Sequence, residues 1–196
     1  MWNLSSVFGV LLGLSGAFSG TDETIGPMGV IKSSNERVLA IYRAHSELDD
    51  ESKQEIVRII EEITNVAVMA RNATKTVCGD LTEEQCQDLN DVFREILKST
   101  SMHKVGRSRV DRFEYLEEEI DSSTARVRTL AHHGDQHLSL DYVLELDGGG
   151  WKIVNYIADD VDTVRNYRKQ FRKLFSRYSF DEVIKRLNKK LEELRR

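Results

Sequence analysis

Residues 136–146, QHLSLDYVLEL, alternate between apolar and polar side chains, and this alternation constrains the fold more than any other part of the chain. Successive side chains of a β-strand point to opposite faces, so a period of two predicts a strand with one buried face. Three glycines follow in DGGG (147–150), and WKIVNYIA (151–158) has the composition of a second strand. Two apolar runs that flank a short glycine-rich stretch predict a β-hairpin.

The glycine run could also suggest a phosphate-binding loop. Such a loop needs a strand before it and the N-terminus of a helix after it. Here a strand-like run follows the glycines, and neither a Lys-Ser/Thr pair nor a third spaced glycine is present. We therefore interpret 147–150 as the tip of the hairpin and expect no nucleotide there.

Apolar residues at spacings of three and four predict helices on both sides of the strands. Thr82 and Gln85 have the spacing of a capping box, which predicts a helix start there. Segregated helices and strands indicate an α+β fold, in which a curved antiparallel sheet of about four strands packs against N- and C-terminal helices, with an apolar cleft between. The expected helices span about 33–48, 51–75, 81–100, 159–178 and 179–196, and the expected strands about 109–120, 124–133, 136–146 and 151–158.

The N-terminal region predicts an exported protein. Val7–Phe18 is an apolar run too short to span a bilayer, and it fits the apolar region of a secretory signal peptide. Ala17 and Ser19 supply small residues for cleavage after Ser19, although the first six residues carry no Lys or Arg. We expect a signal peptide at 1–19, a flexible glycine-containing leader at 20–32 and a single domain at 33–196.

Two cysteines, Cys78 and Cys86, lie between two helical patterns. An even count in an exported protein suggests one disulfide, and two free thiols are the alternative. Their spacing is not that of a metal site, because no second Cys/His pair accompanies them. His132, His133 and His137 lie near Asp135, but this glycine-containing stretch between two strand patterns is more typical of a polar turn than of a metal site.

The charge is unevenly distributed along the chain. The net charge of −5 argues against a general nucleic-acid binder. Residues 165–196 nevertheless hold 12 basic and 4 acidic residues. This segment is either a solvated helix face or a docking face for an anionic membrane or an acidic partner. Glu117–Glu119 fits a solvated strand end, no G-x-S-x-G motif is present, and no catalytic set assembles, so we expect no enzyme.

Two stretches of the chain carry recognisable motifs: 151–171, WKIVNYIADDVDTVRNYRKQF, and 63–97, with an M-A-R helix, a break and an LT-x-EQ motif. Together they resemble the MlaC family, also called the toluene-tolerance family of periplasmic phospholipid-binding proteins. The chain departs from the family pattern at Asn155, where the family has aspartate, at Asp160 in place of glycine and at Asp162 in place of serine. The matching positions of the first stretch are Trp151, Val161, Asn166, Tyr167, Arg168, Gln170 and Phe171.

The resemblance implies a soluble, monomeric periplasmic shuttle that carries phospholipid, without cofactor or metal, between inner- and outer-membrane complexes. These partners would be a lipid ABC transporter complex of the inner membrane and a lipoprotein complex of the outer membrane, and the role would be to maintain outer-membrane lipid asymmetry. Lipid tails would enter the cleft between sheet and helices.

The competing hypothesis is a small α+β domain with a cone-shaped pocket that acts as an enzyme or binds a protein. A register slip of one residue would reverse which strand face is buried, so the face that meets lipid stays open. The candidate lipid-binding residues are Leu138, Leu140, Tyr142, Leu144, Trp151, Ile153, Val154, Tyr156, Val161, Val164 and Phe171.

Overall fold

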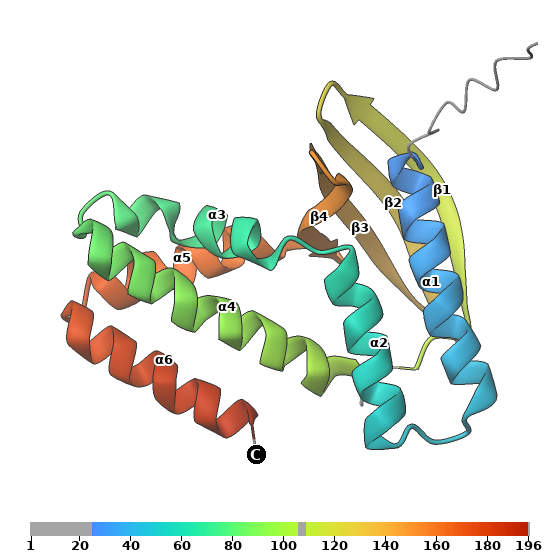
Figure 1. Cartoon of the computed structure of the whole chain (residues 1–196), viewed down its shortest axis with the longest axis horizontal. Coiled ribbons are helices and arrows are strands. Elements are labelled where there is room, and N and C mark those ends of the chain that lie inside the picture. The colour runs from blue at the N-terminus through green and yellow to red at the C-terminus, as the bar shows by residue number, and fades with distance from the viewer. Residues whose placement is uncertain (1–24, 106–108, 196) are drawn as a thin grey trace, which may run out of the picture.

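The computed structural model describes residues 25–105 and 109–195 (Figure 1). Within this part, helices precede and follow an antiparallel sheet, which confirms the predicted α+β fold. The signal peptide expected at 1–19 lies outside the described residues. The elements are α1 (Pro27–Ala44), α2 (Asp50–Glu62), α3 (Val66–Cys78), α4 (Glu83–Val105), β1 (Arg112–Asp121), β2 (Thr124–His133), β3 (Gln136–Asp147), β4 (Gly150–Ala158), β5 (Val161–Asp162), α5 (Thr163–Phe175) and α6 (Phe180–Leu194).

The sheet is a meander in which each strand pairs with the next, in the order β1-β2-β3-β4-β5. It curves around α1, which lies across one face, whereas α3, α4, α5 and α6 form a separate helical layer (Figure 1). The predicted β3–β4 hairpin is confirmed, because Asp147 pairs with Gly150 across the glycine turn. Gly150 has φ +117°, a conformation that side-chain-bearing residues rarely adopt, which explains a glycine at this position.

Helix α1 begins earlier than the sequence pattern predicts. The sequence pattern places its start at about residue 33, but the helix begins at Pro27, so residues 27–32 are not part of a flexible leader. Proline is well suited to the first turn of a helix, since its missing N–H would have no partner there. Ile31 in this first part is completely buried against the sheet, and this burial holds the early turns in place.

The helix predicted over 51–75 is two helices. Helix α2 ends at Glu62 and α3 begins at Val66, with Asn65 accepting a hydrogen bond from the Val68 N–H as N-cap. The intervening residues pair with the edge of β4: the Ile153 N–H donates to Ile63 O (2.7 Å), and the Asn65 N–H donates to Ile153 O (2.8 Å). These tertiary hydrogen bonds explain why the apolar helical period of the sequence does not continue as one helix.

Buried side chains form three clusters. The sheet cluster lies between α1 and the sheet and includes Ile31, Tyr142 and Leu144. The helical cluster lies among α3, α4, α5 and α6 and includes Leu89, Phe93 and Phe171. A third cluster joins α1 and α2. Tyr156 packs against both the sheet cluster and the helical cluster, so the seam between the two clusters passes beside its ring.

Candidate functional site

The register of β3 and β4 shows which strand face is buried under α1. Leu144 pairs with Ile153, and Tyr142 pairs with Tyr156. Ile153 and Tyr156 are three residues apart, so in a regular strand their side chains would point to opposite faces. A β-bulge supplies the extra residue, Val154, that restores both side chains to one face. The predicted lipid-binding residues on this face are Leu138, Leu140, Tyr142, Leu144, Trp151, Ile153 and Tyr156.

The candidate residues lie in different surroundings. Tyr142, Leu144, Trp151 and Ile153 are buried in the sheet cluster, and Leu140 packs against it. Other candidates lie elsewhere: Val164 and Phe171 are buried in the helical cluster, Val154 is buried at the bulge, and Leu138 and Val161 are 40% and 55% exposed. The structure places most of the candidates in the two clusters that meet at Tyr156, and their contact with lipid stays a prediction.

A line of polar side chains lies on the sheet side of the apolar seam. The Tyr156 hydroxyl lies 2.8 Å from Thr64 Oγ1, and Thr64 in turn donates to Ile60 O. The Tyr142 ring meets the Tyr156 ring edge-on with centroids 5.9 Å apart, and its hydroxyl donates to Asn35 Oδ1 (3.5 Å). Burial raises the pKa of Tyr156 to about 12 and also raises the pKa of Tyr142, because an ionised phenol would lose its hydration there.

A cleft of about 370 Å³ opens where three parts of the chain meet. They are the segment joining α2 to α3, the middle of α4, and the β3–β4 hairpin. Arg94, Lys98 and Lys152 contribute positive charge to its lining, and the Lys152 ammonium donates to Glu62 O (2.7 Å). The full lining is Glu61, Glu62, Thr64, Asn65, Val66, Ala67, Arg94, Lys98, Asp147 and Lys152.

This cleft differs from the apolar cleft expected from the sequence, and none of its lining residues was predicted. None of the eleven candidate lipid-binding residues belongs to its lining, which carries six charged side chains. Its volume lies near the lower end of the ~300–1,000 Å³ range of ligand pockets. The lining residues come from separate segments and have no shared sequence pattern. Only the N-cap character of Asn65 hints that the chain changes direction beside the cleft.

The N-terminus of α5 is built by two side chains at positions where the chain departs from the MlaC pattern. Asp162 Oδ1 accepts hydrogen bonds from the Arg165 N–H (2.7 Å) and from Asn155 Nδ2 (2.9 Å). Asn155 Oδ1 in turn accepts from the Val164 N–H (3.0 Å). Asn155 therefore donates and accepts at once, which an aspartate facing Asp162 could not do when both are ionised.

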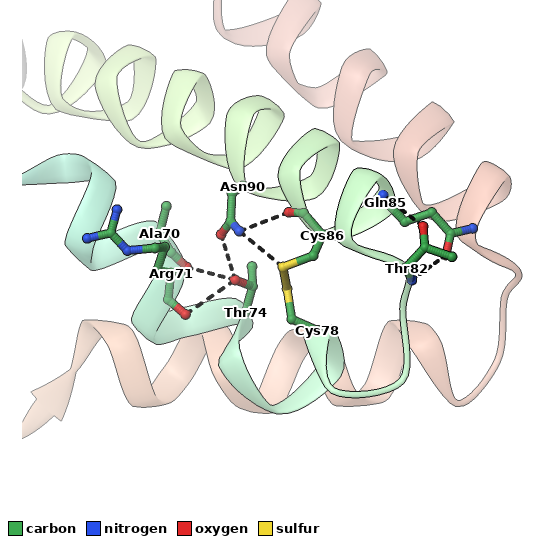
Figure 2. Close-up of a disulfide and its surroundings, with 8 residues drawn as sticks. All are labelled: Ala70, Arg71, Thr74, Cys78, Thr82, Gln85, Cys86 and Asn90. Atoms are coloured by element: carbon green, nitrogen blue, oxygen red, sulfur yellow. Dashed lines mark hydrogen bonds between the residues drawn. A yellow bond between two sulfur atoms is a disulfide. The ribbon is translucent and has the colours of Figure 1, made fainter.

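Figure 2 shows the disulfide between Cys78 and Cys86, which confirms the predicted pairing. It joins the end of α3 to the first turn of α4, with Cα atoms 5.2 Å apart. In the same turn, Thr82 and Gln85 form the predicted capping box through reciprocal hydrogen bonds of 3.1 and 3.2 Å. Closing this short loop stabilises the helical layer by about 2–3 kcal/mol in the chain-entropy model.

The histidines at the end of β2 each lie beside a single carboxylate. His132 contacts Glu114 and His133 contacts Asp111, each at about hydrogen-bond distance (3.2 and 3.1 Å). Over residues 25–105 and 109–195, no three His, Cys, Asp or Glu side chains are grouped so as to hold a metal ion. Across the same ranges, no helix has both the length and the apolar character needed to cross a membrane.

The structure is that of a small α+β protein in which a curved sheet and a helical layer meet at an apolar seam beside a charged cleft. The chain belongs to the MlaC protein family, whose model matches residues 32–189. This result confirms the family resemblance of the two sequence stretches.

A solved structure shares this fold. It is the phospholipid-binding protein from Ralstonia solanacearum, determined in complex with a phospholipid. The two chains are 20% identical and superpose with a TM-score of 0.71, and the match covers 85% of this chain and 97% of the other. No curated protein sequence matches this chain.

Proposed function

We propose that this protein binds phospholipid and carries it through the periplasm between inner- and outer-membrane complexes. The observation that carries the proposal is membership of the MlaC family over most of the chain. The likeness in fold to a protein solved with a bound phospholipid supports it. The role would contribute to outer-membrane lipid asymmetry, with the lipid as ligand and no bond made or broken.

The acyl chains would enter the seam between the sheet cluster and the helical cluster. Tyr156 packs against both clusters, and each cluster offers an apolar wall. The two clusters meet through side-chain packing around Tyr156, so the seam can widen while the hydrogen bonds among the four long strands persist. Each buried CH₂ of a lipid tail contributes about 0.8 kcal/mol, which compensates for the packing lost when the seam widens.

The polar head group would lie in the cleft beside the seam. The cleft is too small for a whole diacyl phospholipid, but it presents both signs of charge: Arg94, Lys98 and Lys152 oppose Glu61, Glu62 and Asp147. A phosphate near the cations forms charge-assisted hydrogen bonds, which are stronger than neutral ones. Thr64 belongs to the cleft lining and also contacts Tyr156, so it connects the cleft to the seam.

Lipid analysis tests this proposal directly. We expect purified protein to contain phospholipid by extraction and mass spectrometry, and lipid-free protein to take up a fluorescent phospholipid from vesicles. The double variant Lys98→Glu, Lys152→Glu reverses two cleft charges and should lower uptake at least about fivefold through lost charge-assisted contacts. The matched control, Lys185→Glu with Lys189→Glu on exposed positions of α6, should take up lipid normally. Absence of both bound lipid and uptake in the unaltered protein would exclude the proposal.

Export is tested separately. The apolar run Val7–Phe18 supports a signal peptide, so mature protein from the periplasmic fraction should begin at Gly20. Intact mass measurement distinguishes this form from the full chain. A full-length chain found only in the cytosol would contradict the periplasmic role, while leaving lipid binding itself to the extraction experiment.

A further inference from the structure

Helix α5 presents an unusually basic outer face. Arg165, Lys169, Arg172 and Lys173 are exposed and follow one another at positions i, i+4, i+7 and i+8, which lie on one side of a helix. We call these four residues the α5 basic face. Residues 163–180 contain six basic and no acidic residues, although the whole chain has a net charge of −5.

The opposite side of α5 explains why these cations point outwards. Tyr167 and Phe171 both pack edge-on against the Phe93 ring, with ring centroids 4.8 Å apart in each case. Val164 is buried in the same helical cluster. The fifth basic residue of α5, Arg168, is held inwards because its guanidinium donates two hydrogen bonds to Asn72 O. These core contacts fix the orientation of α5 about its own axis, so the α5 basic face stays at the surface.

The cations of the α5 basic face have no internal counter-charge. Among the described residues, no carboxylate lies within 4.0 Å of any of the four. Helix α6 differs, since Arg186 pairs with Glu182 (3.1 Å) and Lys190 contacts Glu193 (3.7 Å). The positive potential of the C-terminal region is therefore concentrated on α5, where it is available to an external anion.

We infer that the α5 basic face docks this protein onto the surface of an anionic phospholipid bilayer. The face is one side of a helix, and α5 carries no exposed large apolar side chain. Protein–protein interfaces usually bury an aromatic or aliphatic centre and are poor in lysine, so a protein partner fits this face less well. A bilayer offers many phosphates without fixed positions, which flexible lysine and arginine side chains can meet.

Docking of the α5 basic face on a bilayer depends on the charge of the lipid surface and does not depend on the proposed cargo. Binding should therefore require anionic lipid and weaken as salt rises, because salt screens exposed charges over about 10 Å at 0.1 M. Each basic residue near an anionic surface strengthens binding by about fivefold. Three removed charges then correspond to a loss of about a hundredfold.

Co-sedimentation with vesicles tests the inference, using phosphatidylcholine vesicles with and without phosphatidylglycerol. The test variant Lys169→Gln, Arg172→Gln, Lys173→Gln removes three charges of the α5 basic face. The matched control Lys185→Gln, Lys189→Gln, Lys190→Gln removes three from exposed positions of α6. We expect the unaltered protein and the control to bind anionic vesicles at low salt, and the test variant to bind at least tenfold more weakly. Circular dichroism melts confirm that both variants fold, as glutamine is a good helix former.

Three results would overturn the inference: equal binding to neutral and anionic vesicles, an equal loss in both variants, or no loss in the test variant. Binding to soluble polyglutamate but not to anionic vesicles would also overturn it and would indicate an acidic protein partner instead. Lipid content of the purified protein is measured separately. If the protein contains phospholipid but does not bind anionic vesicles, the docking inference is wrong and the proposed lipid binding is unaffected.

Discussion

At the scale of single residues, Tyr142 and Tyr156 place polar atoms inside an otherwise apolar seam. Each hydroxyl has a partner, Asn35 for Tyr142 and Thr64 for Tyr156, and no buried side-chain polar atom within the described residues lacks a hydrogen bond. Satisfied buried hydroxyls cost little, whereas an unpartnered one costs about 1–3 kcal/mol. These two tyrosines are therefore fixed to α1 and to the segment beside β4 without loss of a buried hydrogen bond.

The two phenols predict a loss of stability at alkaline pH. A tyrosine of the unfolded chain ionises near pH 10. Tyr156 in the folded protein keeps its proton up to about pH 12, and Tyr142 also has a raised pKa. Their contribution is complete below pH 10 and declines as the pH rises towards 12, by about 1.4 kcal/mol per pH unit for each phenol.

Urea unfolding between pH 9 and pH 11.5 measures this effect. Tyr156→Phe removes one of the two phenols and keeps its ring, so its stability should fall less steeply with pH than that of the unaltered protein. Comparing the two slopes cancels the titration of the lysines, which both proteins share. Identical slopes would show that Tyr156 ionises normally in the folded state.

At the scale of elements, the start of α5 shows how departures from a family pattern can compensate one another. The resemblance to the family pattern would place aspartate at 155 and serine at 162, whereas this chain has Asn155 and Asp162. The amide of Asn155 donates to the Asp162 carboxylate, and the same carboxylate caps α5. The preceding turn places Asp159 and Asp160 at φ +44° and +63°, a conformation that aspartate tolerates better than most residues.

This arrangement predicts that the two positions are energetically coupled. Asn155→Asp alone places two carboxylates in contact and should lower the free energy of unfolding by about 1–3 kcal/mol. Adding Asp162→Ser recreates the family pair and should recover most of the loss, because serine also caps helices well. Urea unfolding of the two single variants and the double variant gives the coupling energy. Additive losses would contradict the proposed contact.

At the scale of the whole molecule, the sheet with α1 and the helical layer are two packed bodies that meet along the seam (Figure 1). The disulfide joins α3 to α4 and stabilises the helical layer without crossing the seam (Figure 2). The extended residues 63–65, paired with β4, connect the two bodies. A ligand between the two bodies would therefore change how they pack against each other more than it would change the structure of either body.

If the seam holds phospholipid, removing the lipid should destabilise the protein. A ligand present at about 100 times its Kd stabilises the folded state by about 2.7 kcal/mol. For a chain of this size that corresponds to a melting temperature about 5–10 °C higher with lipid than without. Thermal melts of detergent-delipidated and reloaded protein measure the difference. Equal melting temperatures, with reloading verified by mass spectrometry, would contradict lipid binding in the seam.

Several local features could be predicted because neighbouring residues decide them. The Thr82–Gln85 capping box, the turn at 147–150 and the disulfide each depend on residues close in sequence. The cleft could not be predicted, since its lining joins α2, α3, α4 and the β3–β4 hairpin. The face of β4 could not be predicted either, because a bulge at Val154 changes which side chains lie together.

The sequence by itself determined the α+β class, the order of the strands along the chain and the family, because side-chain periodicity and short motifs are local properties. The tertiary structure alone decided that α1 starts at Pro27, that residues 63–65 interrupt a helical pattern, and that Ile153 and Tyr156 share a face. Each of these depends on a partner distant in sequence, such as the sheet behind Ile31 or the edge of β4 beside Thr64. Burial and hydrogen bonding with distant partners outweigh local helix and strand preferences of less than about 1 kcal/mol per residue.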